Sequence, residues 1–137
     1  MTNARNIARN QQGFTLIEII AVLILLGILA AVAVPKFMGM QSDAQAKAID
    51  GALAAGVSNA TMAYSKFLLT NGSAPTSISS NAWSDGSNTQ AIETDLGDFT
   101  ASYSYDTSTK EVTVTLTAGP SWFSGYSGSK TKTFTIQ

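Results

Sequence analysis

Few side chains in this chain could take part in chemistry. Its 137 residues include no histidine and no cysteine, which excludes disulfides, zinc sites, thiol nucleophiles and histidine acid–base catalysis. The only local group of acids comprises Glu93, Asp95 and Asp98. Three carboxylates this close in sequence could bind a hard cation such as calcium, although such groups more commonly lie in solvent or cap a helix. We therefore expect no enzymatic activity, no metal and no cofactor.

One further carboxylate stands out by its surroundings. Glu18 is the only charged residue among the 21 residues from Phe14 to Val34, a stretch long enough to cross a bilayer as a helix. A carboxylate at membrane depth costs roughly 2.5–3.5 kcal/mol, so Glu18 needs a cationic partner in an apolar environment. Two other interpretations stay open, a secretory signal cleaved near Ala33 and an unprocessed signal anchor.

The residues before the apolar stretch are polar and basic. Residues 1–13 contain Arg5 and Arg9 and no acid, which favours a cytoplasmic N-terminus. The whole chain has a formal net charge of -1, whereas nucleic-acid binding would require a basic face. We therefore expect no nucleic acid as a partner of the subunit itself.

Residues 13–37 resemble the N-terminus of type IV prepilins and their pseudopilin relatives. The resemblance rests on a glycine, a phenylalanine directly after it and a glutamate four residues later, at the head of an apolar run that ends near a proline. It implies a leader, residues 1–13, that a membrane-embedded prepilin peptidase removes between Gly13 and Phe14. The same enzyme would methylate the new amine of Phe14.

The resemblance also assigns roles within the apolar stretch, residues 14–36. Glu18 would serve filament assembly, and Gly27 and Pro35 would bracket a segment able to lose helicity in the filament. A carboxylate one turn from a helix N-terminus suits the helix dipole. We hypothesise that the Phe14 amine of a neighbouring subunit is the cation that Glu18 requires.

The remaining chain, residues 37–137, predicts a headpiece that begins with an amphipathic helix. Apolar residues recur every three or four positions from Ile49 to Phe67, and Met40, Ala44 and Ala48 extend this stripe upstream. The helix should run over about 37–70 and bend at Pro35. Residues 71–98 are rich in Asn, Gly and Ser, which is typical of a long connecting loop.

Strand patterns follow the loop. Apolar and polar residues alternate over 99–105 and 112–117, with a hairpin turn at Asp106–Lys110, and a third run covers Lys132–Ile136. We also expect a short helical turn within the loop, at Thr89–Leu96. The predicted fold class is α+β: a pilin fold whose long N-terminal helix packs its amphipathic half on an antiparallel sheet of three or four strands, residues 99–137.

Other features allow two interpretations each. Trp122, Phe123 and Tyr126 could pack in the core or form an adhesive surface patch, and Asn59 and Asn71 begin glycosylation sequons that are common by chance. A looser resemblance links Val34 to Gly51 with mannose-sensitive haemagglutinin-type pilins. The chain lacks both the disulfide of many type IV pilins and, in residues 118–130, the acidic calcium loop of the major secretion pseudopilin.

We therefore expect the structural major subunit of a type IV pilus-like filament, serving adhesion, motility or DNA uptake. Its partners would be copies of itself, the prepilin peptidase and an inner-membrane assembly platform. The precursor would lie in the bacterial inner membrane and the filament on the cell surface. The alternative is a type II secretion pseudopilin in a short periplasmic filament, and an enzyme or ligand-binding domain on a membrane anchor is the least favoured reading.

Overall fold

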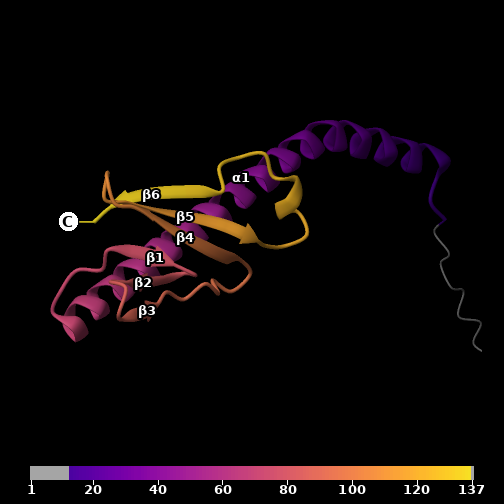
Figure 1. Ribbon diagram of the computed structural model, residues 1–137. Coiled ribbons are helices and arrows are strands. Elements are labelled where there is room, and N and C mark those ends of the chain that lie inside the picture. The colour runs from indigo at the N-terminus through magenta and orange to yellow at the C-terminus, as the bar shows by residue number, and fades with distance from the viewer. Residues whose placement is uncertain (1–12, 137) are drawn as a thin grey trace, which may run out of the picture. The chain divides into compact units, whose positions relative to one another are not determined.

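The computed structural model describes residues 13–136. Within this range a long helix, α1 (Leu16–Asn71), precedes two three-stranded antiparallel sheets (Figure 1). The chain separates into two compact units, Met1–Ser42 and Asp43–Gln137, and we call the second unit the headpiece. The α+β class expected from the sequence is confirmed, while all of the predicted leader except Gly13 lies outside the described residues.

Helix α1 continues without interruption through Pro35. The proline removes one backbone donor, yet the helix does not end there. In the headpiece, its buried positions recur every three or four residues and are Ile49, Ala52, Leu53, Gly56, Ala60, Ala63 and Phe67. The predicted stripe from Ile49 to Phe67 is confirmed.

The upstream extension of that stripe was wrong. Met40, Ala44 and Ala48 are exposed, because burial against the headpiece sheets begins only at Ile49. Small and apolar side chains at the right spacing continue the apolar pattern, but spacing alone does not specify how far along a helix its partner reaches.

The sheet that covers the stripe consists of β4 (Thr100–Asp106), β5 (Glu111–Ala118) and β6 (Thr131–Thr135), in that order. On one face, the inward residues Ala101, Tyr103, Val112, Val114 and Leu116 are all buried. The hairpin expected at Asp106–Lys110 joins β4 to β5, and its last residue, Lys110, has a φ of 57°. The three strands predicted after residue 98 are present, and β4 begins one residue later than the pattern suggested.

A second sheet replaces the long loop that the sequence predicted for residues 71–98. It is formed by β1 (Ser77–Ser79), β2 (Ala82–Ser84) and β3 (Thr89–Ala91). The helical turn expected at Thr89–Leu96 was also wrong, since this stretch begins with β3. Strands of three residues are too short to show a period of two, and their Ser- and Thr-rich composition is the same as that of a loop.

Trp83, on β2, anchors the second sheet to α1. Its side chain is fully buried, and its indole Nε1–H donates a hydrogen bond of 3.0 Å to the carbonyl oxygen of Ala60. The rings of Tyr64 and Tyr105 pack edge-to-face against the indole with centroid distances of 5.1 and 5.3 Å. One aromatic side chain thus connects the helix with both sheets in a chain that has no disulfide.

Two glycines on the same helix provide a matched test of this packing. A Cβ added at Gly56 would lie 2.6 Å from Cγ1 of buried Val114, whereas nothing lies within 4 Å of one added at Gly51. Gly56→Ala should lower the free energy of unfolding by about 1–3 kcal/mol through overpacking. Gly51→Ala should raise it by up to about 1 kcal/mol through helix propensity. Urea titration followed by circular dichroism checks both, and equal effects would contradict the packing.

Candidate functional site

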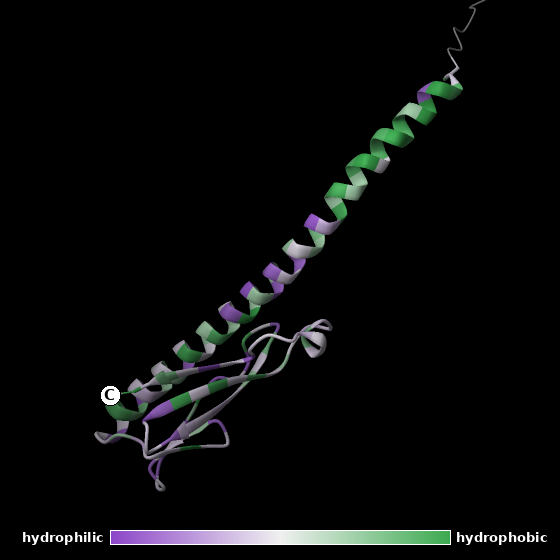
Figure 2. Cartoon of the chain, turned by 90° about the horizontal axis from the view of Figure 1, so that it is seen from above, coloured by the Kyte–Doolittle hydropathy of each residue, from purple (hydrophilic) through white to green (hydrophobic). Residues whose placement is uncertain are grey.

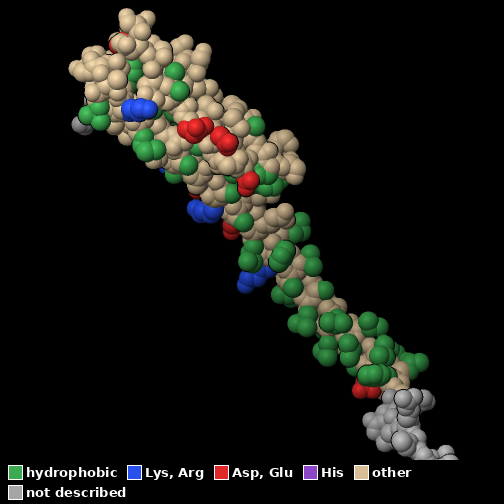
Figure 3. Space-filling model, turned by 90° about the horizontal axis from the view of Figure 1, so that it is seen from below, with side chains coloured by type: hydrophobic (Ala, Val, Ile, Leu, Met, Phe, Trp, Pro, Cys, Tyr) green, Lys and Arg blue, Asp and Glu red, His purple; other side chains and the backbone are tan. Residues whose placement is uncertain are grey.

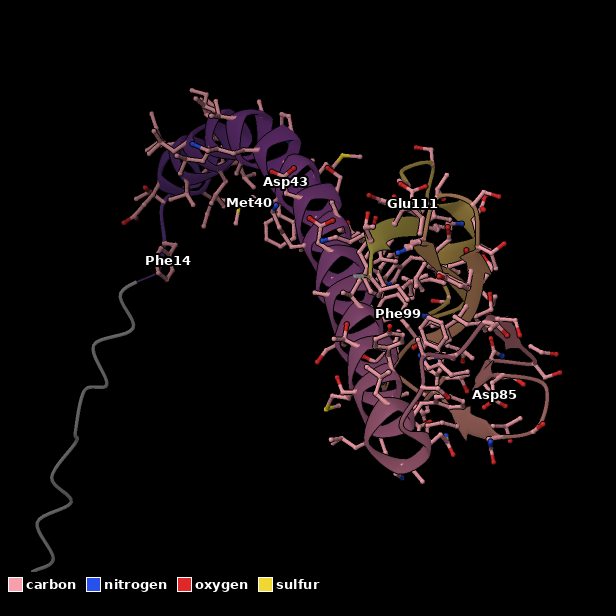
Figure 4. All side chains as sticks on the ribbon, turned by 60° about the vertical axis from the view of Figure 1, so that its left-hand side comes forward. Phe14, Met40, Asp43, Asp85, Phe99 and Glu111 are labelled. Carbon is pink, nitrogen blue, oxygen red and sulfur yellow. The ribbon has the colours of Figure 1, made fainter. Side chains whose placement is uncertain are left out.

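The proposed cleavage point lies immediately before α1. Gly13, Phe14 and Thr15 precede the helix, which begins at Leu16, and Figure 4 shows Phe14 on this preceding segment. Oγ1 of Thr15 accepts a hydrogen bond of 3.4 Å from the backbone N–H of Glu18. Thr15 is therefore the N-cap of the helix, and the Gly13–Phe14 bond lies outside the helical hydrogen bonding.

The role of Thr15 was missed in the sequence, although a signal was present. Threonine followed three residues later by glutamate, directly before an apolar run, is the pattern of a capping box. The carbonyl oxygen of Thr15 also accepts from the backbone N–H groups of Glu18 and Ile19, at 3.1 and 3.3 Å. The N-cap fixes where the helix starts, two residues after the proposed cut.

Glu18 occupies the first turn of α1, where the partial positive charge of the helix N-terminus favours a carboxylate. Its side chain is exposed, and within residues 13–136 it forms no ion pair. The helix terminus alone contributes only about 0.3–1 kcal/mol, which is less than the cost of a carboxylate in an apolar environment. Within the described residues, no cation offsets this cost for Glu18.

The helix around Glu18 is apolar on all sides. Every large apolar side chain from Phe14 to Phe37 is at least 46% exposed, and Figure 2 shows this part of α1 almost uniformly hydrophobic. Within the described residues, α1 is the one helix whose length and composition would allow it to cross a membrane. A helix that is hydrophobic all round is stable only in lipid or among other apolar helices.

Gly27 and Pro35, the two positions predicted to permit loss of helicity, both lie inside the continuous helix. A Cβ at Gly27 would meet no atom within 4 Å. Among the described residues, the missing side chain of Gly27 therefore makes room for no neighbouring atom. A glycine costs the helix up to about 1 kcal/mol against alanine, and no contact in this part of the chain offsets that cost.

The acidic group at residues 93–98 organises the local backbone. Oε1 of Glu93 accepts from the backbone N–H of Asp95 at 3.1 Å, and Oδ1 of Asp95 accepts from that of Gly97 at 2.9 Å. Within the described residues, no group of three potential metal-binding side chains comes together. The geometry supports the reading as solvated carboxylates that shape a turn.

The aromatic residues of the loop between β5 and β6 were expected either to pack in the core or to form a surface patch. Phe123 is buried and packs edge-to-face on Phe99 at 5.8 Å, whereas Trp122 and Tyr126 are half-buried and contact each other at 6.4 Å. The ammonium of Lys130 lies 4.4 Å from the ring centre of Phe123. These contacts stabilise the loop between β5 and β6, so packing accounts for most of the cluster.

Tyr103 should make the headpiece less stable at alkaline pH. Its hydroxyl donates a hydrogen bond of 2.8 Å to the carbonyl of Glu93, and burial, with the Glu93 charge adding to it, raises the pKa of Tyr103. The unfolded chain thus loses this proton first, and stability should fall as the pH rises through about 10. In Tyr103→Phe the fall should be shallower; urea midpoints measured from pH 8 to 11 check this, and identical slopes would contradict it.

Comparison with known proteins points to one class. The model of the prokaryotic N-terminal methylation motif matches residues 8–34. The type IV major alpha-pilin of Moraxella bovis is 48% identical over 46 residues, which cover 34% of this chain and 29% of that protein. Fimbrial protein Q of the same organism matches with the same identity and coverage, and no solved structure matches the chain.

The chain is thus a protein with the N-terminal methylation motif of prokaryotic pilins. In this N-terminal segment it is similar to type IV pilins. The match spans about three-tenths of the length of the curated relatives, and the methylation motif covers residues 8–34 of this chain.

Proposed function

We propose that this chain is the structural subunit of a type IV pilus-like filament. The observation that carries the proposal is the start of α1, where the methylation motif, the capped helix and Glu18, the single charge among exposed apolar residues, coincide. The two relatives are named as a major pilin and a fimbrial protein, which favours a surface pilus over a secretion pseudopilus.

In this proposal the precursor waits in the bacterial inner membrane with its apolar helix in the bilayer. Prepilin peptidase cuts between Gly13 and Phe14 and methylates the new amine. An inner-membrane assembly platform then moves the subunit into the filament, where the apolar helices of many copies replace lipid around one another. The filament would serve adhesion, motility or DNA uptake.

Apolar side chains alone do not fix how two helices align along their length. Assembly therefore needs a specific interaction that sets their register. The amine of Phe14 and the carboxylate of Glu18 would provide it when they come from neighbouring subunits, because a charge in an apolar environment is costly unless an opposite charge pairs with it. The segment between Gly27 and Pro35 would then be free to lose helicity and adapt to the packing of its neighbours.

A substitution at Gly13 tests the first proposed step, which is removal of the leader by the peptidase. Gly13→Val places a branched side chain at the scissile bond, so we expect the precursor to persist and filaments to be lost. Gly51→Ala, on the same chain but far from the cut, should be processed normally. Mass spectrometry of membrane and sheared surface fractions reads the outcome. Mature wild-type subunits that start at a residue other than Phe14 would contradict the assignment.

Electron microscopy of the sheared fraction tests the filament itself. Long filaments that contain this chain are expected. Short filaments confined to the periplasm, formed only together with an outer-membrane secretion complex, would instead favour the pseudopilin reading.

A further inference from the structure

The two edges of the β4–β5–β6 sheet carry opposite charges. Strand order places β6 at one edge and β4 at the other (Figure 1). Lys132 lies on β6 and Lys130 directly before it. Beyond β4 runs the segment 93–98, which we call the acidic segment, with Glu93, Asp95 and Asp98.

The acidic segment is fixed along β4 by backbone contacts. The N–H of Ala101 donates to the carbonyl of Thr94 at 2.9 Å, that of Leu96 donates to the carbonyl of Phe99 at 2.9 Å, and Asp95 pairs with Thr100. The β4 edge is therefore covered, and its cover presents carboxylates to solvent. Figure 3 shows acidic side chains together on one face of the headpiece.

The β6 edge, in contrast, is open. The carbonyl of Lys130 accepts from the N–H of Leu116, and the N–H of Ile136 donates to the carbonyl of Lys110. Because antiparallel pairing alternates, Lys132 and Phe134 also direct their backbone groups toward β5, whereas Thr131, Thr133 and Thr135 direct theirs away from it. Thr131 is partly satisfied by the hydroxyl of Ser129, but Thr133 and Thr135 face no other strand in the part of the chain that the structure describes.

Within the part of the chain that the structure describes, these charges form no ion pairs. Among residues 13–136 the ion pair formed is Lys47 with Asp50, at 3.5 Å on α1. Lys132 is exposed, as are Glu93, Asp95 and Asp98. Glu93 and Asp95 each use one carboxylate oxygen for a local turn, and Asp98 accepts no hydrogen bond in the described range.

We propose that the β6 edge of one subunit binds the acidic segment of a second copy of this chain. The inference rests on the proposed function and adds a contact between headpieces to the contact between apolar helices. The ammonium of Lys132 and the outward N–H groups of Thr133 and Thr135 are donors, and carboxylates accept hydrogen bonds from both, most strongly from charged donors.

The arrangement favours a polymer over a closed dimer. The two edges lie on opposite sides of one sheet, so each subunit offers β6 to one neighbour and its acidic segment to another. Such a heterologous contact repeats without closing and produces an open helical assembly. Lysine on an edge strand also disfavours pairing with an identical edge, so β6 of one copy is repelled by β6 of another and attracted to the acidic segment.

Cross-linking tests the contact directly, since the chain has no cysteine of its own. The double variant Thr133→Cys with Thr100→Cys places exposed thiols on β6 and beside the acidic segment while keeping every charge of the contact. It is assembled in cells, and sheared filaments are treated with a short bismaleimide. We expect a ladder of covalent multimers on denaturing gels. The matched control joins Thr133→Cys to Ser87→Cys, at the exposed loop between β2 and β3, and should give no ladder.

The outcomes separate this inference from the proposed function. Filaments without a ladder, or with an equal ladder in the control, overturn the headpiece contact and leave the filament subunit standing. Absence of filaments from the wild-type chain overturns both.

A charge exchange keeps the inference testable without any cysteine. Lys132→Glu and Asp98→Lys, both at exposed positions, should each cause loss of filaments in washes of raised salt. The double variant should restore them, because every subunit again presents complementary edges. A double variant no better than either single one would overturn the contact, as would single variants that behave like the wild type.

Discussion

Replacing Glu18 by valine is expected to abolish filament assembly while leaving leader cleavage intact. The valine removes the only charge of the apolar run, so the helix should remain at least as stable in the bilayer. It also removes the group that would attract the Phe14 amine of an incoming subunit. Western blots of membrane and sheared fractions should show processed subunit in the first and none in the second.

Two controls define the reason for that loss. Glu18→Gln keeps size and hydrogen bonding but not charge, and it should fail in the same way if the ion pair is what matters. Asp43→Val removes a carboxylate from the exposed face of the same helix, outside the apolar run, and should assemble normally. Normal filaments from Glu18→Val would contradict the proposed pairing.

Trp83→Ala should be the most destabilising single substitution in the headpiece. It removes a fully buried indole, its hydrogen bond to Ala60 and two edge-to-face contacts, with Tyr64 and Tyr105. Replacing a buried aromatic residue by alanine costs about 3–5 kcal/mol. A free energy of unfolding of about 5–15 kcal/mol, usual for a domain, would lose a large part of its value.

The measurement is urea unfolding of the full chain in detergent, followed by circular dichroism. Trp83→Phe keeps the apolar volume in part but loses the donor to Ala60, and it should cost less than the alanine. Leu69→Ala is the control, because Leu69 is 88% exposed and its loss should change stability by less than about 0.5 kcal/mol. If Trp83→Ala were as mild as Leu69→Ala, the indole would not hold the sheets to the helix.

The strongest sequence signals were those repeated over many residues. The stripe from Ile49 to Phe67 and the alternation in β4 and β5 each repeat a period several times, and both were confirmed. The apolar run has no period but is long, and it is helical as expected. The sheet formed by β1, β2 and β3 was not predicted, since its strands have three residues each. Their position is set by tertiary contacts, chiefly the burial of Trp83, which no local pattern reveals.

In the candidate site, too, local motifs could be recognised in the sequence, whereas features set by the tertiary structure could not. Gly13, Phe14 and Glu18 were assigned from a short motif, and their cleavage and assembly roles remain predictions. Thr15 was legible as a capping residue but was missed. The open edge of β6 depends on which strand takes the outer place in the sheet, and the sequence does not specify strand order.

The N-cap at Thr15 has a consequence for maturation. Because the Gly13–Phe14 bond lies before the first helical residue, its hydrolysis breaks none of the hydrogen bonds that hold the helix. In the proposed pathway, removing the leader takes away Arg5 and Arg9 and creates one amine two residues from the helix start. The helix would then have the same conformation in the precursor and in the mature subunit, and the two would differ in the charge at its N-terminal end. Processing would thus permit polymerisation without any refolding of the helix.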